Sequence, residues 1–255
     1  MSSSVSSRVE ASHSVQCCGL FYRLREAFSS SNNNIMPMIL NYFDLPGRGE
    51  PTRIALSIAG VDYVDKRLSF EEYGASSFKQ LPVLQMDGAE YAQSTALLRY
   101  AGKLGGLYPG DPLAAMKVDE IVMAAEDVNI TLFTTMSIKD PEEQASESES
   151  QPPPPPSASL WQQLKTRKEL SVGKLKTMLE GLAAKLAANS SSPYFVGDSL
   201  TIADLQVQSI VQNVEMGFLE GFSTTLVSEV APTIKAHHDA VMKHPKVKAY
   251  YASKA

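Results

Sequence analysis

A tyrosine and an arginine near the start of the patterned part of the chain are of the types that bind and stabilise an anion. Tyr42 lies at the end of the apolar run Met38–Phe43, and Arg48 follows a short turn-forming stretch. A fixed phenol hydroxyl can donate a charge-assisted hydrogen bond worth about 1.5–3 kcal/mol to a thiolate. The alternative for Tyr42 is a half-buried strand tyrosine with a structural hydrogen bond. The alternative for Arg48 is a solvated surface arginine.

Any thiol that Tyr42 could ionise must come from outside this part of the chain. The only cysteines are Cys17 and Cys18, and adjacent cysteines rarely bridge, so no disulfide framework is expected. A free thiol with a pKa of about 8.5 is only a few per cent ionised at neutral pH. Lowering that pKa by about two units takes roughly 2.7 kcal/mol, and one phenol hydrogen bond can supply much of it.

Several residues further along could hold the polar groups of a small ligand. Ser94 is predicted to open a helix, so its hydroxyl and the helix N-terminus could bind a carboxylate, and a simple N-cap is the alternative role. Gln80 and Gln93 carry amides that can donate hydrogen bonds.

The elements that must position Tyr42 form a strand–helix–strand unit. Met38–Phe43 is a predicted strand, closed by a turn-forming stretch. A helix is predicted to begin at Glu50 and to stop at Gly60, and Tyr63–Val64 is a second predicted strand. A strand, a helix and a strand within about 30 residues make a βαβ unit.

The elements that must position Ser94 form a hairpin and a helix. Pro82–Met86 and Ala89–Tyr91 are predicted strands joined by the turn Asp87–Gly88, and Ser94 opens the helix that follows. The order β-α-β then β-β-α predicts an α/β domain with a thioredoxin-like fold over residues 37–108.

The rest of the chain, residues 109–255, is predicted to be an all-helical domain that begins with a Pro-rich linker. Residues 140–159 interrupt it with acidic residues, a proline run and no Lys or Arg, and they are predicted to form a solvated, disordered insertion. Helical structure is predicted to resume over about residues 160–188. Thr201 and Asp204 have the spacing of a helix capping box worth roughly 1 kcal/mol. We assign the box a structural role and no chemistry.

Residues 1–36 are predicted to be an extension that does not join the core. They contain polar low-complexity tracts and a short amphipathic stretch, with few acidic residues and several serines and arginines. An organelle transit peptide and a poorly ordered tail both fit this composition.

Composition and charge exclude other classes of function. The formal net charge is −5, which argues against a nucleic-acid surface and gives no polybasic signal for anionic membranes. No apolar run approaches the roughly 20 residues that a membrane-spanning helix needs, so no stable membrane insertion is expected.

The sequence from about Met38 to the C-terminus resembles the cytosolic glutathione S-transferases of the tyrosine type, closest to the sigma class. The motifs that carry the resemblance occur in the family's order. They are the N-terminal signature Tyr42–Pro51, the proline segment Gln80–Leu84, the pair Gln93–Ser94, and Phe195–Asp198 followed by the capping box.

The resemblance implies a catalytic role for Tyr42, which would hold glutathione as a thiolate, with support from Arg48. It implies glutathione as co-substrate, a small hydrophobic electrophile as second substrate, and no metal. The electrophile site would lie between the domains, surrounded by apolar residues of the helical domain. The residues that the resemblance assigns to glutathione binding are Lys79, Gln80, Leu81, Pro82, Gln93 and Ser94.

The resemblance also implies a cytoplasmic homodimer. Asp127 matches an acid that reaches the ammonium of glutathione in the partner subunit, and Phe78 lies where related enzymes carry an aromatic key at the dimer interface.

The sequence departs from the sigma pattern in the segment Ser69–Lys79. This segment is shorter than usual and lacks the tryptophan and lysine that sigma-like enzymes place there to bind the glycyl end of glutathione. Trp161 lies in the helical domain, and Lys79 is the candidate substitute. Met123 replaces an acid that some prostaglandin isomerases use. A non-catalytic relative with the same fold, and a glutathione-dependent isomerase or peroxidase, are the alternatives to a conjugating enzyme.

Overall fold

The chain divides into two units, Met1–Pro37 and Met38–Ala255. The predictions for residues 1–36 and 140–159 lie outside the part that the structure describes. The computed structural model describes residues 37–69, 72, 79–134, 165–170, 173–190, 192–217, 219 and 221–254.

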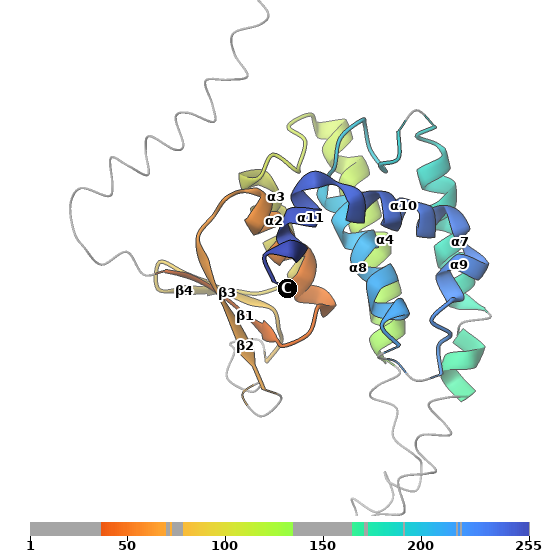
Figure 1. The fold of residues 1–255 in the computed structure, drawn as a ribbon, viewed down its shortest axis with the longest axis horizontal. Helices are drawn as coiled ribbons and strands as arrows, with labels where there is room; N and C mark the ends of the chain where they lie inside the picture. Colours follow the sequence, from red (N-terminus) through yellow and green to blue (C-terminus); the bar gives the residue numbers. More distant parts are fainter. Residues whose placement is uncertain are drawn as a thin grey trace, which may run out of the picture. The chain divides into compact units, whose positions relative to one another are not determined.

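A four-stranded mixed sheet forms the first half of this unit (Figure 1). The strand order is β2-β1-β3-β4; β1 pairs parallel with β2 and antiparallel with β3, which in turn pairs antiparallel with β4. The parallel pair requires a crossover helix, whereas the antiparallel pair is joined by a tight turn. The strands are β1 (Met38–Phe43), β2 (Tyr63–Leu68), β3 (Val83–Met86) and β4 (Ala89–Tyr91).

The helices of this half connect the strands as the thioredoxin-like pattern requires. The 3-10 turn η1 (Gly47–Gly49) leads into α2 (Glu50–Ile58), which is the crossover between β1 and β2. The β3–β4 turn has positive φ at Asp87 and Gly88, 51° and 78°, which is typical of a two-residue hairpin turn. Helix α3 (Ser94–Leu104) follows β4.

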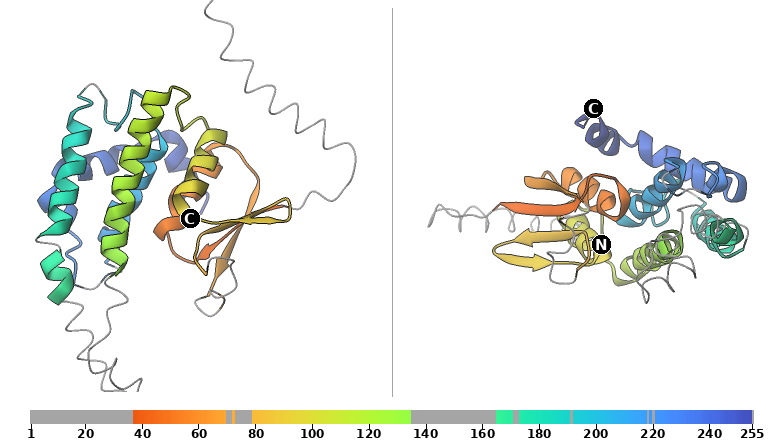
Figure 2. Two further views of the ribbon diagram at one scale, coloured as in Figure 1. Left: turned by 180° about the vertical axis from the view of Figure 1, so that it is seen from behind. Right: turned by 90° about the horizontal axis from the view of Figure 1, so that it is seen from below.

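The second half of the unit is helical. Helix α4 is the longest of these elements, and α4 and α8 run side by side in Figure 1 and in the left view of Figure 2. The helices are α4 (Pro112–Thr134), α7 (Lys174–Ala187), α8 (Ile202–Glu215), α9 (Leu226–Val230), α10 (Pro232–Lys243) and α11 (Pro245–Ala252). The predicted fold class, a thioredoxin-like α/β half followed by an all-α half, is confirmed.

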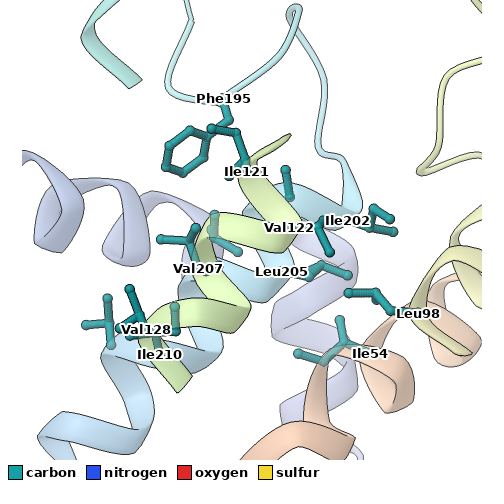
Figure 3. Packing of buried hydrophobic residues seen from close by; sticks show 14 of the residues in the cluster. Ile54, Leu98, Ile121, Val122, Val128, Phe195, Ile202, Leu205, Val207 and Ile210 are labelled. Carbon is teal, nitrogen blue, oxygen red and sulfur yellow. The ribbon is translucent and has the colours of Figure 1, made fainter. Parts of the chain in front are cut away.

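One continuous hydrophobic core joins the two halves. Ile54 of α2 and Leu98 of α3 are buried in the same cluster as Val122 of α4 and Leu205 of α8 (Figure 3). Since α8 also contacts α2 and α3, it forms a shared wall between the sheet half and the helical half.

The start of α8 is fixed by Asp204. Its carboxylate accepts hydrogen bonds from the backbone N–H and the hydroxyl of Thr201, at 2.7 and 2.9 Å. It also accepts the backbone N–H of Phe195 at 2.9 Å and lies 2.9 Å from Nε2 of His237, where both side chains are fully buried. The box therefore ties α8 to the preceding loop and to α10.

Two elements differ in extent from the sequence prediction. Strand β2 continues to Leu68 because pairing with β1 extends over polar residues that local propensity would end at Val64. The helical stretch expected over residues 160–188 includes a helical segment at 165–170, and Gly173 precedes a separate helix, α7. Within the described residues, no helix is long and apolar enough to cross a membrane.

Candidate active site

Tyr42 lies near the end of β1, and its ring is enclosed by the turn that follows. The residue is buried, with 6% of its surface exposed. A Cβ on Gly49 would lie 2.7 Å from Cδ1 of Tyr42, and a Cβ on Gly47 would collide with the Tyr42 hydroxyl. The turn can therefore close over the ring because glycine stands at these positions.

The Tyr42 hydroxyl is held as an acceptor by the backbone. The N–H of Arg48 donates to Oη of Tyr42 at 2.8 Å, which leaves the phenol hydrogen free to be donated elsewhere. Burial raises the pKa of Tyr42, while the Arg48 hydrogen bond and the nearby Arg48 and Arg53 charges oppose the rise. The phenol is thus a protonated donor at neutral pH.

A buried arginine fixes the loop between Tyr42 and Arg48. The Arg53 guanidinium donates to the carbonyls of Phe43 and Leu45 at 3.1 and 2.9 Å, and to Asp65 on β2 at 2.9 Å. Its charged carbon also lies 5.3 Å from the centre of the Tyr42 ring. Because the carboxylates of Asp65 and Glu50 compensate the burial of Arg53, the loop is held by a paired charge.

The β3 and α3 side of the site presents polar groups. The Leu81–Pro82 peptide is cis. The side chains of Gln93 and Gln80 are joined by a hydrogen bond of 3.4 Å, and Gln93 has φ 73° and ψ 102° immediately before Ser94 opens α3. The first backbone N–H groups of a helix have no partner inside it, so this terminus can accept a carboxylate.

Helix α4 supplies the opposite wall. The Arg48 side chain pairs with Glu126 at 3.0 Å and lies 5.8 Å from the centre of the Phe133 ring. Burial raises the pKa of Glu126, and the charge of Arg48 opposes that rise. Glu126 also accepts long hydrogen bonds of 3.5 Å from Asn129 and Gln206.

These groups surround a single pocket of about 300 Å³. It is large enough for part of a small ligand and combines a phenol, amides, a helix N-terminus, an ion pair and aromatic rings. The lining residues are Tyr42, Phe43, Arg48, Gln80, Leu81, Gln93, Ser94, Glu126 and Phe133.

Most of the residues singled out from the sequence meet in this pocket. Pro82 is buried beside it, whereas Lys79 and Asp127 are exposed and do not line it. Phe78 lies outside the described residues. The residues brought together are Tyr42, Arg48, Gln80, Leu81, Gln93 and Ser94.

Sequence reasoning missed the aromatic and acidic walls, Phe43, Glu126 and Phe133. From the helical half, the apolar Phe133 and the charged Glu126 both line the pocket. The sequence feature that could have found Glu126 and Phe133 is their spacing on α4. Glu126, Asn129 and Phe133 recur at helical intervals and therefore share one face. Across the described residues, no group of three or more His, Cys, Asp or Glu side chains is placed to hold a metal ion.

Two family models and a known protein sequence match this chain. The family model for the glutathione S-transferase N-terminal domain matches residues 38–103, and that for the C-terminal domain matches residues 157–254. Glutathione S-transferase 1 of Ascaris suum is 30% identical over 219 residues, which cover 84% of this chain and 95% of that protein.

Solved structures show the same fold. A glutathione S-transferase from Ascaris lumbricoides has a TM-score of 0.61 and 27% identity, covering 86% of this chain and 98% of that chain. Prostaglandin synthase D of Nilaparvata lugens has a TM-score of 0.69 and 23% identity, covering 86% of this chain and 99% of that chain.

Proposed function

Because the chain belongs to the glutathione S-transferase family, we propose that it joins the sulfur of glutathione to small hydrophobic electrophiles. The observation that carries the proposal is the state of the Tyr42 hydroxyl. It is buried in the pocket wall, accepts the N–H of Arg48 at 2.8 Å and keeps its own hydrogen to donate. A donor held in this way favours the thiolate over the thiol of a bound glutathione.

The reaction would proceed by nucleophilic attack of the glutathione sulfur. The thiol proton leaves to solvent, and the Tyr42 O–H donates to the resulting thiolate without transferring its proton. The sulfur then forms a bond to the electrophilic carbon, and in a substitution the leaving group departs with the electron pair of the bond that breaks. In an addition, the electron pair moves into the electrophile, which takes a proton from water.

The polar side of the pocket suits the glutathione backbone. We assign the γ-glutamyl carboxylate to Ser94 and the N-terminus of α3, with Gln80 and Gln93 as amide donors. Leu81, held by the cis bond to Pro82, would pair its backbone with the cysteinyl residue of the tripeptide. Lys79, which directly precedes Gln80 in the sequence, is the candidate that we assign to the glycyl carboxylate.

The opposite side suits an aromatic or unsaturated electrophile. Phe43 and Phe133 provide apolar faces, and Arg48 lies against Phe133 with 30% of its side chain exposed. A cation beside the reacting carbon stabilises negative charge that develops on the electrophile during attack. Arg48 would therefore act on the electrophile and, through its N–H, on Tyr42.

The proposal extends to the class and assembly of the protein. We propose a cytoplasmic, sigma-like homodimer in which Asp127 of one subunit and Phe78 complete the neighbouring site and the interface. The exposed position of Asp127 on α4 fits such a role, because the side chain is available to a second subunit.

The experiment is to measure conjugation of glutathione to an aryl halide by the native chain and by Tyr42→Phe. Removing the donated hydrogen bond should lower kcat/KM by about ten-fold or more, which corresponds to about 1.4 kcal/mol in the barrier. Tyr91→Phe is the matched control, because Tyr91 is an exposed tyrosine on β4 outside the pocket, and its activity should equal the native value.

Two outcomes would contradict conjugation as the function. If the native chain neither conjugates nor binds glutathione, a non-catalytic relative takes the place of the enzyme. If it binds glutathione and only isomerises or reduces substrates in a panel, the same thiolate serves an isomerase or a peroxidase.

A further inference from the structure

One peptide group in the turn after β1 is hydrogen-bonded at both of its ends. The C=O of Gly47 accepts a hydrogen bond from Oγ of Ser209 at 3.0 Å. The N–H of the same peptide belongs to Arg48 and donates to Oη of Tyr42 at 2.8 Å. Ser209 lies on α8, 162 residues further along the chain, so the helical half of the molecule reaches the Tyr42 hydroxyl through a single peptide group.

The Gly47–Arg48 peptide group is rigid, so a hydrogen bond at its oxygen also sets the orientation of its N–H. The Gly47–Arg48 bond is not among the cis peptides, and in a planar trans peptide the C=O and N–H point in opposite directions. Fixing the oxygen therefore fixes the direction of the N–H. Gly47 has φ 45°, and its missing Cβ leaves the space that the Tyr42 hydroxyl occupies, so this orientation depends on the glycine.

We propose that Ser209 is a positioning residue for catalysis, which aligns and polarises the Gly47–Arg48 peptide so that Tyr42 stabilises the glutathione thiolate. This inference rests on the proposed function and adds a residue that does not touch the pocket. Ser209 is not among the pocket-lining residues, and 1% of its surface is exposed.

Polarisation follows from the chain of donors. A hydroxyl that donates to a carbonyl draws electron density from the amide and makes its N–H a stronger donor, because linked hydrogen bonds reinforce one another. The stronger Arg48 N–H bond withdraws density from Oη of Tyr42, so the phenol hydrogen becomes a better donor to sulfur. No proton is transferred along this series of hydrogen bonds, because each donor keeps its hydrogen.

The position of Ser209 on α8 supports a dedicated contact. Ile210 and Val211 beside it are buried and apolar, and a buried hydroxyl is costly unless it is hydrogen-bonded. One turn earlier on the same helix, Gln206 donates to Glu126, which pairs with the Arg48 side chain. Helix α8 is therefore linked to Arg48 by two sets of hydrogen bonds, one through Gln206 and Glu126 and one through Ser209. Only the Ser209 contact involves the peptide group that binds Tyr42.

The test is the pKa of the thiol of bound glutathione, read from thiolate absorbance against pH at saturating glutathione. Ser209→Ala should raise that pKa by about half a unit to one unit, equivalent to about a three- to ten-fold smaller thiolate fraction below the pKa. Ser209→Thr keeps a hydroxyl and should restore the native value. The charged groups that face Tyr42 are Arg48, Arg53 and Glu126, and both variants leave them unchanged.

A double variant separates positioning from a structural role. Tyr42→Phe removes the hydroxyl through which Ser209 is proposed to act. In that background, adding Ser209→Ala should raise the thiol pKa no further. The control Thr131→Val removes a buried hydroxyl of α4 that donates to the Asp127 carbonyl at 2.9 Å, and it should leave the thiol pKa at the native value.

The results that overturn the inference differ from those that overturn the function. If Tyr42→Phe raises the thiol pKa and Ser209→Ala, still folded by circular dichroism, does not, Ser209 only satisfies the Gly47 carbonyl. If Ser209→Ala does not fold, a native thiol pKa in the folded Ser209→Cys, which replaces the hydroxyl with a weak donor, overturns the inference, and a raised pKa supports it. If Tyr42→Phe itself leaves the pKa unchanged, the proposed function fails first.

Discussion

Two glycines and a buried arginine determine where the Tyr42 hydroxyl lies. Gly47 and Gly49 leave room for the ring, and Arg53 holds the intervening loop carbonyls. The Tyr42 phenol is therefore held by its own turn and by the arginine that fixes the loop. This arrangement is consistent with a donor that must not reorganise during the reaction.

Glu126 is a residue whose charge should serve activity at some cost in stability. Its pKa lies above the ordinary 4.5 because of burial, so the folded state binds its proton more tightly than the unfolded state. Its contribution to stability therefore falls as the pH rises above about 4.5. Glu126→Gln removes this dependence but also removes the partner that orients Arg48.

We expect Glu126→Gln to lower kcat/KM about three-fold or more, roughly 0.7 kcal/mol in the barrier, because the guanidinium loses its partner. Its free energy of unfolding relative to the native chain should increase from pH 4 to pH 8. Urea denaturation at the two pH values measures this difference. A variant that becomes relatively less stable at pH 8 would show that the ion pair stabilises the fold.

At the residue level, the sequence predicts the local part of the site and misses the part made by tertiary packing. Tyr42 and Ser94 stand in short motifs whose turns and helix starts are encoded nearby. Glu126 and Ser209 meet the first motif only when α4 and α8 pack against η1, over sequence separations that no local pattern records. A serine in an apolar helix face looks the same in sequence whether or not it has such a partner.

Among the helices of the helical half, α8 packs most extensively against the sheet half, where it contacts α2, α3 and η1. Ile202, at its first turn, packs directly against Gly102 of α3, so closely that a Cβ on Gly102 would collide with Cγ2 of Ile202. The backbone of α3 and the side chains of α8 can approach this far because position 102 has no side chain.

Matched glycine substitutions test this contact. Gly102→Ala should lower the free energy of unfolding by about 1–3 kcal/mol, because the collision outweighs the helix propensity of alanine. Gly181→Ala lies on a face of α7 where no described residue outside the adjoining helix backbone comes within 4 Å of the new Cβ. It should raise the free energy of unfolding by about 0.5–1 kcal/mol. Chemical denaturation measures both. Equal effects at the two positions would contradict the packing of α3 on α8.

The elements themselves were largely predictable because their boundaries carry local chemistry. The turn at Asp87–Gly88 and the Thr201–Asp204 pair occur where the sequence pattern places them. The extent of β2 was not, because its charged residues are poor strand formers in isolation and are held in the sheet by pairing with β1.

At the scale of the whole molecule, four exposed apolar side chains recur at helical spacing along α4 and are about half exposed or more. The exposed charged residues Glu120 and Asp127 lie on the same side of the helix. The exposed apolar side chains are Leu113, Met116, Met123 and Ile130. These side chains support the proposed homodimer, in which Asp127 would reach the neighbouring site.

Light scattering tests this assembly. A mass of twice the chain is expected, and Met116→Glu with Met123→Glu should reduce it to that of a single chain, because buried charges oppose association. Leu104→Glu, at an exposed residue near the end of α3, is the control for added charge. A native chain that is already monomeric would contradict both the homodimer and the role of Asp127.

The central claim is that Tyr42 holds glutathione as a thiolate, and the pH titration of the bound thiol tests it most directly. The native chain should show a thiol pKa about two units below the free value of about 8.5, and Tyr42→Phe should return it most of the way toward that value. A thiol pKa that is the same in both proteins, or is not lowered in the native chain, would contradict the claim.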